Sequence, residues 1–365
     1  CYITLTPERA LADAAESDKR YAAGNPLPLD GIPIGMKDLF ATRGIRTTAA
    51  SHILENFTPE YESTVSQKFI DAGTVLLGKT NLDEFAMGTF SKTSFFSAPI
   101  SPYQIENKLT AGGSSGGTTS AVASGLAIGG TGTDTGGSIR FPAAITGLVG
   151  MKPTYGLCSR WGCVAFASSL DTPGPIARTV DDAALLLSAM TGYDEKDSTS
   201  ANAGFYVKDR LPQIGLNKLK IGVIKEFDDV EISPDMKKLF DERIEDLKKS
   251  GAEIITVSIP NILDALAAYY IIAPAEASSN LARYDGMRYG LRVEGKDLID
   301  TYKKTRAAGF GEEVQRRMVV GTAVLSSESY EVYFMQAARV RRLIADAFNH
   351  AFEQCDLIVC PSSAG

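Results

Sequence analysis

The chain has 365 residues, of which 44% are hydrophobic and 22% charged, and its formal net charge is −7 at pH 7. This length is sufficient for one large domain or two ordinary ones. Because phosphate contacts require clustered lysine and arginine side chains, the acidic balance excludes the chain alone as a strong nucleic-acid-binding protein. We also expect no membrane-spanning segment and no signal peptide, since no apolar stretch has the required length or pattern.

From the N-terminus onward, the sequence pattern predicts helices that alternate with strands. A helix is expected over residues 7–23, with Thr6 as its cap and Pro7 in its first turn. A short apolar strand over 32–36 then places Lys37 at its end. The next predicted elements are a helix over 62–72, a strand over 74–77, a capped short helix over 81–88 and a polar loop over 91–110.

Residues 73–80, GTVLLGKT, match the P-loop pattern letter for letter. A P-loop requires its strand before the first glycine, and its middle residues wrap phosphates with their N–H groups. Here the middle residues are a β-forming apolar run, so the strand occupies the place of the loop. We therefore reject nucleotide binding by this segment.

Two glycine-rich knots dominate the centre, at 112–117 (GGSSGG) and 132–140 (GTDTGGSIR). The apolar run between them, 121–128, predicts a buried helix leading into a strand. Dense glycines indicate positive φ or close backbone approach, and each knot carries a serine. The pattern suits a hydroxyl nucleophile beside backbone N–H donors, and the alternative is a pair of tight structural turns.

The second half continues the alternation. Predicted elements are a strand and turn over 147–154, a helix over 181–190, a linker-like surface connection over 193–217, a strand over 219–224, a helix over 234–249, a strand over 253–257, long helical patterns over 260–284 and 310–354, and a strand over 357–359. This order predicts an α/β fold in which helices cover both faces of a central sheet.

The five cysteines and two histidines do not suggest a metal site. Cys158 and Cys163, like Cys355 and Cys360, have four residues between them, which is wider than a two-residue zinc knuckle. We predict no metal and reduced thiols, as in cytosolic proteins.

A histidine-based hydrolase is a second interpretation of the first knot. Residues 112–116 satisfy the Gly-x-Ser-x-Gly elbow of α/β hydrolases, which need a histidine late in the chain. Only His350 qualifies, and it lies inside a helical pattern where a surface histidine is expected. A lysine-based mechanism fits the remaining residues better.

The two knots, together with Gly31-Ile32-Pro33-Ile34-Gly35-Met36-Lys37-Asp38, resemble the amidase signature family over essentially the whole chain. The resemblance implies a layered α/β/α fold with a central mixed sheet in a single domain, residues 1–365, that lacks a short N-terminal and a larger C-terminal segment. It implies that Ser138 is the nucleophile, Ser114 a bridging serine entered by a cis peptide bond, and Lys37 a base that acts as a neutral amine.

The same resemblance assigns roles in the second knot. Backbone N–H groups of Thr135, Gly136 and Gly137, with that of Ser138, would form the oxyanion hole. We expect Asp134 and Arg140 to form an ion pair that supports the loop, rather than to react.

Flanking segments are more specific than the triad. Residues 159–162, 276–281, 283–286 and 310–317 resemble the glutamine-hydrolysing subunits of glutamyl-tRNA(Gln)/aspartyl-tRNA(Asn) amidotransferases. This resemblance implies glutamine as substrate and ammonia as the product passed to a B subunit, with a C subunit that clamps the assembly. ATP and Mg²⁺ would bind the B subunit, tRNA would be held mainly by it, and this chain would need no cofactor. The assembly would lie in the cytoplasm, or in an organelle matrix in a eukaryote.

Glutamine recognition requires a cation for its α-carboxylate, and Arg317 is the candidate, with Tyr269 as a further contact. The alternative for Arg317 is a helix-surface ion pair. The resemblance puts the residue for the α-amino group beyond the end of this chain.

The chain departs from the family pattern at Leu39, Ala111 and Thr118, where asparagine, proline and serine are usual. Two other functions stay open: a free-standing amidase for small or hydrophobic amides, and a catalytically silent scaffold.

Overall fold

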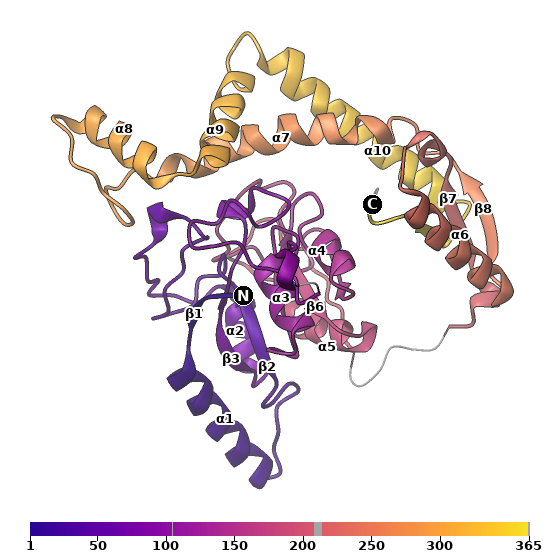
Figure 1. Ribbon diagram of the computed structural model, residues 1–365, viewed down its shortest axis with the longest axis horizontal. Coiled ribbons are helices and arrows are strands. Elements are labelled where there is room, and N and C mark those ends of the chain that lie inside the picture. The colour runs from indigo at the N-terminus through magenta and orange to yellow at the C-terminus, as the bar shows by residue number, and fades with distance from the viewer. Residues whose placement is uncertain (104, 208–213, 364–365) are drawn as a thin grey trace. The chain divides into compact units, whose positions relative to one another are not determined.

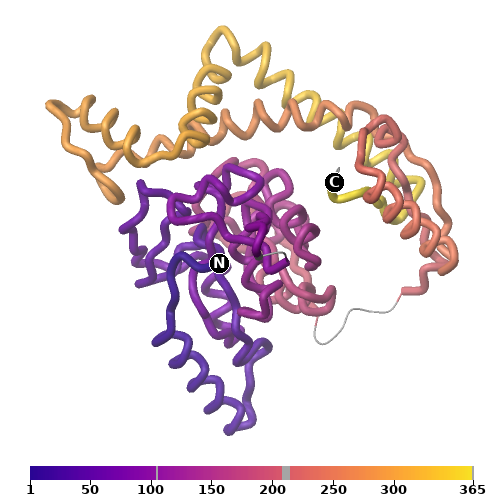
Figure 2. Tube along the Cα trace, viewed as in Figure 1, coloured from indigo at the N-terminus to yellow at the C-terminus, as the bar shows by residue number. Residues whose placement is uncertain are grey.

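The computed structural model describes residues 1–103, 105–207 and 214–363. The chain divides into two compact units, Cys1–Leu211 with Glu276–Val319, and Pro212–Ala275 with Val320–Gly365. Figures 1 and 2 follow the chain through both units by colour. The single domain over 1–365 stays a prediction. Residues 208–213 of the linker-like connection lie outside the described residues.

The first unit contains a six-stranded mixed sheet with the order β1-β3-β2-β4-β6-β5. Strand β2 (Pro33–Lys37) runs parallel to β3 (Val75–Thr80) and β4 (Gly129–Asp134), and the other neighbouring pairs are antiparallel. The remaining strands are β1 (Tyr2–Leu5), β5 (Val149–Gly150) and β6 (Thr172–Ala177). The predicted α/β fold with a mixed sheet is confirmed.

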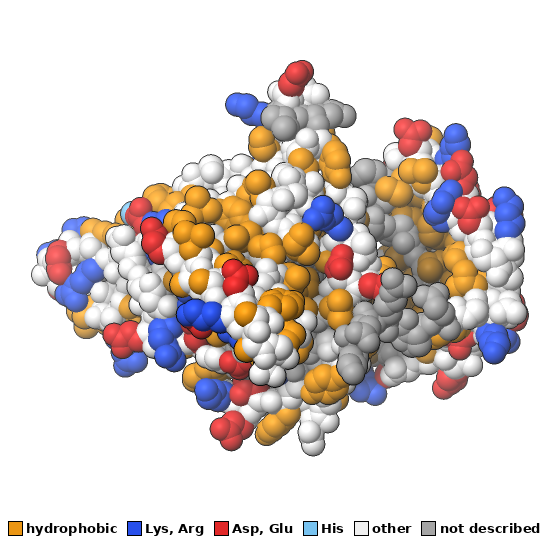
Figure 3. All heavy atoms as spheres, turned by 90° about the horizontal axis from the view of Figure 1, so that it is seen from below, with side chains coloured by type: hydrophobic (Ala, Val, Ile, Leu, Met, Phe, Trp, Pro, Cys, Tyr) orange, Lys and Arg blue, Asp and Glu red, His pale blue; other side chains and the backbone are white. Residues whose placement is uncertain are grey.

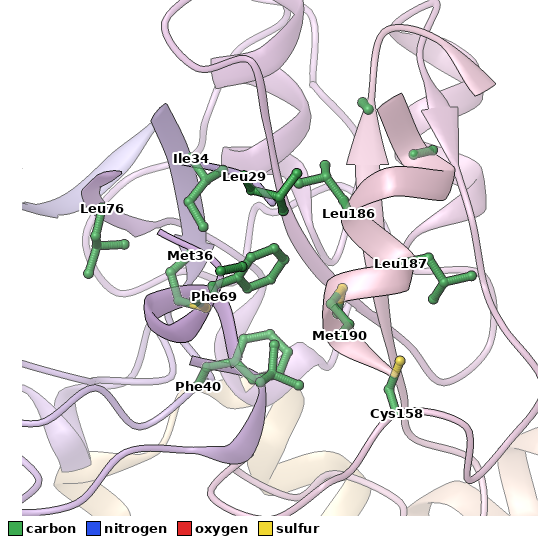
Figure 4. Packing of buried hydrophobic residues seen from close by; sticks show 14 residues of the cluster. Leu29, Ile34, Met36, Phe40, Phe69, Leu76, Cys158, Leu186, Leu187 and Met190 are labelled. Atoms are coloured by element: carbon green, nitrogen blue, oxygen red, sulfur yellow. The ribbon is translucent and has the colours of Figure 1, made fainter. Parts of the chain in front are cut away.

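Hydrophobic side chains of the sheet pack against two helices to form the core of this unit (Figure 4). Ile34 and Met36 of β2 pack with residues of α2 (Thr64–Asp71) and α5 (Val180–Met190). Because successive side chains of a strand point to opposite faces, Lys37 points away from this core. Helix α3 (Gly116–Ala123) contacts β2 and β4 and begins inside the first glycine knot.

The other helices of the first unit are α1 (Pro7–Ala22), α4 (Arg140–Ile145), α8 (Leu298–Gly309) and most of α9 (Glu312–Val324). Helix α1 agrees with its prediction, but Thr6 does not cap it, because its hydroxyl donates to the Leu76 carbonyl at 2.8 Å. Helix α8 was not predicted.

Two predictions around the knots need correction, and one strand was missed. The capped helix over 81–88 is a single 3₁₀ turn, Glu84–Ala86, in which Phe85 has a φ of 49°. The run 121–128 holds only the end of α3 and the turn before β4. Strand β6 was not predicted, because its two prolines lack the N–H that a central strand normally donates.

The second unit contains a three-stranded parallel sheet in the order β8-β7-β9. Its elements are β7 (Lys220–Ile224), α6 (Pro234–Lys249), β8 (Glu253–Val257), most of α7 (Ala265–Asn280), a π-helical turn (Tyr330–Phe334), α10 (Met335–Phe352) and β9 (Leu357–Val359). Ile224, Val257, Ile259, Ala351 and Cys355 form its core. The predicted strands and α6 are confirmed here.

Basic and acidic side chains lie interspersed on the face shown in Figure 3. Among the described residues, no helix is long and apolar enough to cross a membrane. The described part of the chain also contains no group of three or more His, Cys, Asp or Glu residues that could hold a metal ion.

Candidate active site

The amino group of Lys37 lies at the end of β2 among three hydroxyl groups. Its Nζ is 2.9 Å from Ser114 Oγ, 2.9 Å from Ser115 Oγ and 2.8 Å from Thr133 Oγ1. No part of the Lys37 side chain is exposed. A neutral amine offers two donors and one lone pair, so it can donate to two of these hydroxyls and accept from the third.

Burial lowers the pKa of Lys37 to about 7 from an ordinary value of 10.5. Nearby Asp83, Asp134 and Asp171 oppose the shift, because carboxylates favour the charged ammonium. The loss of hydration lowers the pKa of Lys37 by more than these carboxylates raise it, since all three groups that contact the amine are uncharged hydroxyls. The amine is therefore poised to gain and lose a proton near neutral pH.

The first knot holds Ser114 against Asp83. The peptide bond between Gly113 and Ser114 is cis, as the resemblance implies. The Asp83 N–H donates to the Ser114 carbonyl at 3.2 Å, and the Asp83 carboxylate accepts from Ser91 N–H at 2.8 Å. A Cβ atom at Gly113 would lie 2.1 Å from Asp83 Oδ2, so this close approach requires glycine.

The second knot places Ser138 beside the first. The Ser115 N–H donates to the Ser138 carbonyl at 3.2 Å, and Ser138 itself is 8% exposed. Within the described residues the Ser138 hydroxyl makes no hydrogen bond, so no direct Ser114–Ser138 hydroxyl contact is formed here. The structure thus brings Lys37 and Ser114 into contact and joins the backbone of Ser138 to that of Ser115, the residue after Ser114.

The loop that carries Ser138 is folded around the Asp134 carboxylate. Asp134 accepts hydrogen bonds from the N–H groups of Gly137, Ile139 and Arg140. The Arg140 guanidinium adds bonds of 3.0 and 2.9 Å, which is the expected ion pair. Although burial opposes it, the bonds and charge of Arg140 hold the pKa of Asp134 below its usual value.

The predicted oxyanion donors of this loop are not equivalent. The Gly137 N–H points to Asp134 Oδ1 at 2.8 Å, and this bond counts against a donor role for it. Among the described residues, the N–H groups of Thr135, Gly136 and Ser138 find no acceptor. Gly137 has a φ of +125°, which a residue with a side chain rarely adopts. The oxyanion role of this loop stays a prediction, with the N–H groups of Thr135, Gly136 and Ser138 unengaged.

Arg317 lies on α9 and is only 7% exposed. Its Nε donates to Glu313 Oε1 at 2.8 Å, so the alternative ion pair is present, but the arginine is buried rather than on a surface. Its guanidinium carbon lies 5.6 Å from the centroid of the Phe166 ring. Stacking on an aromatic ring holds the planar guanidinium in a defined orientation.

The buried carboxylate of Glu84 fixes the start of α9. Its two oxygens accept from the Gly311 N–H at 2.9 and 3.1 Å, and Oε1 accepts from the Ser51 hydroxyl at 2.5 Å. Glu84 is 2% exposed, and burial raises its pKa to about 7. The residue next to Asp83 thus anchors the helix that carries Arg317.

Tyr269 belongs to the second compact unit, where its ring packs edge-on against Tyr270 at 5.2 Å. Its contact with glutamine stays a prediction. Sequence reasoning did not find Ser115 and Thr133 as partners of Lys37, although both lie in the glycine knots. Nor did it find Asp171, for which no local signal exists.

Comparisons with known proteins agree with this geometry. The family model named Amidase matches residues 1–365. The A subunit of glutamyl-tRNA(Gln) amidotransferase from Caulobacter vibrioides is 55% identical over 367 residues, covering 99% of this chain and 75% of that protein.

Two solved structures are similar. The crystal structure of the A subunit of glutamyl-tRNA(Gln) amidotransferase from Thermotoga maritima has a TM-score of 0.75 and 40% identity, covering 96% of this chain and 75% of that one. The native peptide amidase from Stenotrophomonas maltophilia has a TM-score of 0.76 and 30% identity, covering 99% and 77%. From the match over its whole length and the geometry at Lys37, this chain belongs to the amidase family.

Proposed function

We propose that the protein is the glutamine-hydrolysing subunit of a tRNA-dependent amidotransferase, which releases ammonia from L-glutamine for amidation of Glu-tRNA(Gln), Asp-tRNA(Asn) or both. The observation that carries the chemistry is the buried Lys37 amine, 2.9 Å from Ser114 Oγ and with a pKa of about 7. The substrate assignment is supported by 55% identity to the A subunit of a glutamyl-tRNA(Gln) amidotransferase across 99% of the chain.

In the proposed mechanism, neutral Lys37 accepts the proton of Ser114, which takes the proton of the Ser138 hydroxyl. Ser138 Oγ attacks the side-chain carbonyl of glutamine, and N–H groups of the 135–138 loop stabilise the oxyanion. The relay returns a proton to the leaving nitrogen, ammonia departs, and water hydrolyses the acyl-serine to glutamate. The Ser114–Ser138 contact is expected to form with substrate, because catalytic hydrogen bonds often tighten only in the complex.

Arg317 is proposed to bind the α-carboxylate of glutamine, with Tyr269 as a further contact. A planar guanidinium matches a carboxylate in bidentate geometry, and the guanidinium carbon of Arg317 lies over the Phe166 ring.

Ammonia is proposed to pass to a B subunit that binds ATP, Mg²⁺ and most of the tRNA, with a C subunit joining the two larger subunits. The formal charge of −7 agrees with this division, because RNA and ATP would be bound by the partner. Such an assembly acts where tRNA is charged, so we place it in the cytoplasm.

The test is ammonia release from L-glutamine by the chain alone and then by the assembly with its B and C partners and mischarged tRNA. We expect release that rises sharply with the partners and is lost in Ser138→Ala. Acetamide serves as the comparison substrate, since it offers no carboxylate to Arg317. Turnover of acetamide by the chain alone, without turnover of glutamine, would favour a free-standing amidase. Unchanged activity of Ser138→Ala would favour a catalytically silent scaffold.

A further inference from the structure

The Asp171 carboxylate bonds to two separate parts of the candidate site. Its Oδ1 accepts a hydrogen bond from the Thr135 hydroxyl at 2.7 Å. Its Oδ2 accepts from the backbone N–H groups of Phe166 and Ala167, at 2.8 and 3.0 Å. Asp171 is 6% exposed, and burial raises its pKa above the usual value. One buried carboxylate therefore joins two segments through different oxygen atoms.

Each segment carries one end of the proposed glutamine site. Thr135 begins the loop with the oxyanion donors and Ser138, where the amide would react. Phe166 lies under the guanidinium of Arg317, where the α-carboxylate would bind. On the basis of the proposed function, we propose that Asp171 is a positioning residue that fixes the separation between the oxyanion donors and Arg317, and thereby selects an amide with the chain length of glutamine.

The reactive loop has a support of its own besides Asp171. Asp134 already holds it through the N–H groups of Gly137, Ile139 and Arg140 and through the Arg140 guanidinium. The bond from the Thr135 hydroxyl is additional and leads to another segment. Its loss is therefore expected to change the register between the two segments rather than the form of the loop.

The Phe166 segment is also anchored independently of Asp171. Glu276 on α7 accepts from the Ser169 N–H at 2.8 Å and from its hydroxyl at 2.6 Å. The Asn280 side chain donates to the Phe166 carbonyl at 3.1 Å. Both segments thus keep their own supports, and Asp171 is the described side chain that hydrogen-bonds to Thr135 and to the Phe166 backbone together.

Separation matters because L-glutamine and L-asparagine differ by one methylene between the α-carbon and the amide. A misplacement of about 1 Å can lower a rate by about a hundredfold. A fixed distance from Arg317 to the oxyanion donors therefore discriminates between the two amides, whereas a reagent that lacks an α-carboxylate is insensitive to it.

The test compares two reagents for Ser138 in the complete assembly. A diazoketone analogue of L-glutamine requires both ends of the site, whereas phenylmethanesulfonyl fluoride requires only the reactive end. Asp171→Ala removes the carboxylate and with it both connections, whereas an asparagine could keep them, because its amide oxygen accepts from the two N–H groups and its nitrogen can donate to the Thr135 hydroxyl oxygen. We expect the ratio of the diazoketone to the sulfonyl fluoride inactivation rate to fall about tenfold, with a similar fall in the glutamine-to-asparagine ratio of kcat/KM.

Asp197→Ala is the matched control, because it makes the same change in a buried carboxylate that binds the Arg160 and Thr199 backbones. It should leave both ratios unchanged. Thr135→Val removes only the hydroxyl and should reproduce the fall in both ratios. It also tests the proposal if Asp171→Ala unfolds.

Equal slowing of both reagents, or no change in either ratio, would overturn the positioning role. Failure of the unmodified assembly to hydrolyse glutamine is a different result: it would remove the proposed function and this inference with it.

Discussion

The protonation of Lys37 leads to a prediction about pH. Burial shifts its pKa from 10.5 to about 7, which corresponds to about 5 kcal/mol against the charged form. At pH 7 about half of the amine is then neutral, whereas an ordinary lysine would be neutral in about one molecule in three thousand. Because only the neutral amine accepts the Ser114 proton, kcat/KM for glutamine should be half-maximal near pH 7 and fall tenfold per pH unit below it.

The assay is initial-rate ammonia release from L-glutamine by the assembly between pH 5.5 and 9, with Lys37→Arg and Lys37→Met in parallel. Arginine cannot release its proton and methionine has none to accept, so both variants should lose at least about a hundredfold at every pH. Methionine avoids a buried unpaired charge, so it covers the case in which the arginine variant unfolds.

Unfolding measurements give an independent readout of the same group. The native state holds Lys37 neutral above pH 7, while the unfolded chain keeps it protonated up to about pH 10.5, so this lysine makes stability rise with pH across that window. Lys37→Met should remove that rise. A rate plateau extending well below pH 6, or either variant retaining more than about a hundredth of the activity, would refute the lysine relay.

Two further predictions concern α9. Arg317→Lys keeps the charge but loses the planar fork, so KM for glutamine should rise at least about tenfold with a smaller change in kcat; steady-state kinetics would contradict this if kcat alone fell. The pKa of Glu84 is raised from 4.5 to about 7, so the folded state holds its proton more tightly than the unfolded chain. The resulting stabilisation is complete below pH 4.5, and about 3 kcal/mol of unfolding free energy is lost as pH rises to about 7. Glu84→Gln should therefore be more stable than the parent at pH 8 and similar at pH 5 in urea denaturation, whereas parallel pH curves would exclude this effect.

Local sequence predicted the elements whose pattern is self-contained. The amphipathic helices α1 and α6 and the short apolar strands β2, β7, β8 and β9 follow from periodicity and terminal residues alone. Strand β6 did not, because its prolines contradict a central strand and only pairing with β4 and β5 stabilises it. The 3₁₀ turn at 84–86 was predicted as a longer helix for a similar reason, since its form follows from tertiary contacts of Asp83 and Glu84.

Residue types and their spacing along the chain identify the groups available for chemistry: a lysine after a short strand and two serines in glycine knots. What those groups can do depends on contacts that form in the folded chain. Burial among three hydroxyls, rather than any neighbour in sequence, lowers the pKa of Lys37. Asp171 hydrogen-bonds both to Thr135 of the reactive loop and to the backbone of Phe166, whose ring contacts Arg317. The loop and Arg317 are far apart in sequence. Local patterns cannot encode these contacts, because desolvation and hydrogen bonding between distant segments exist only once the chain is folded.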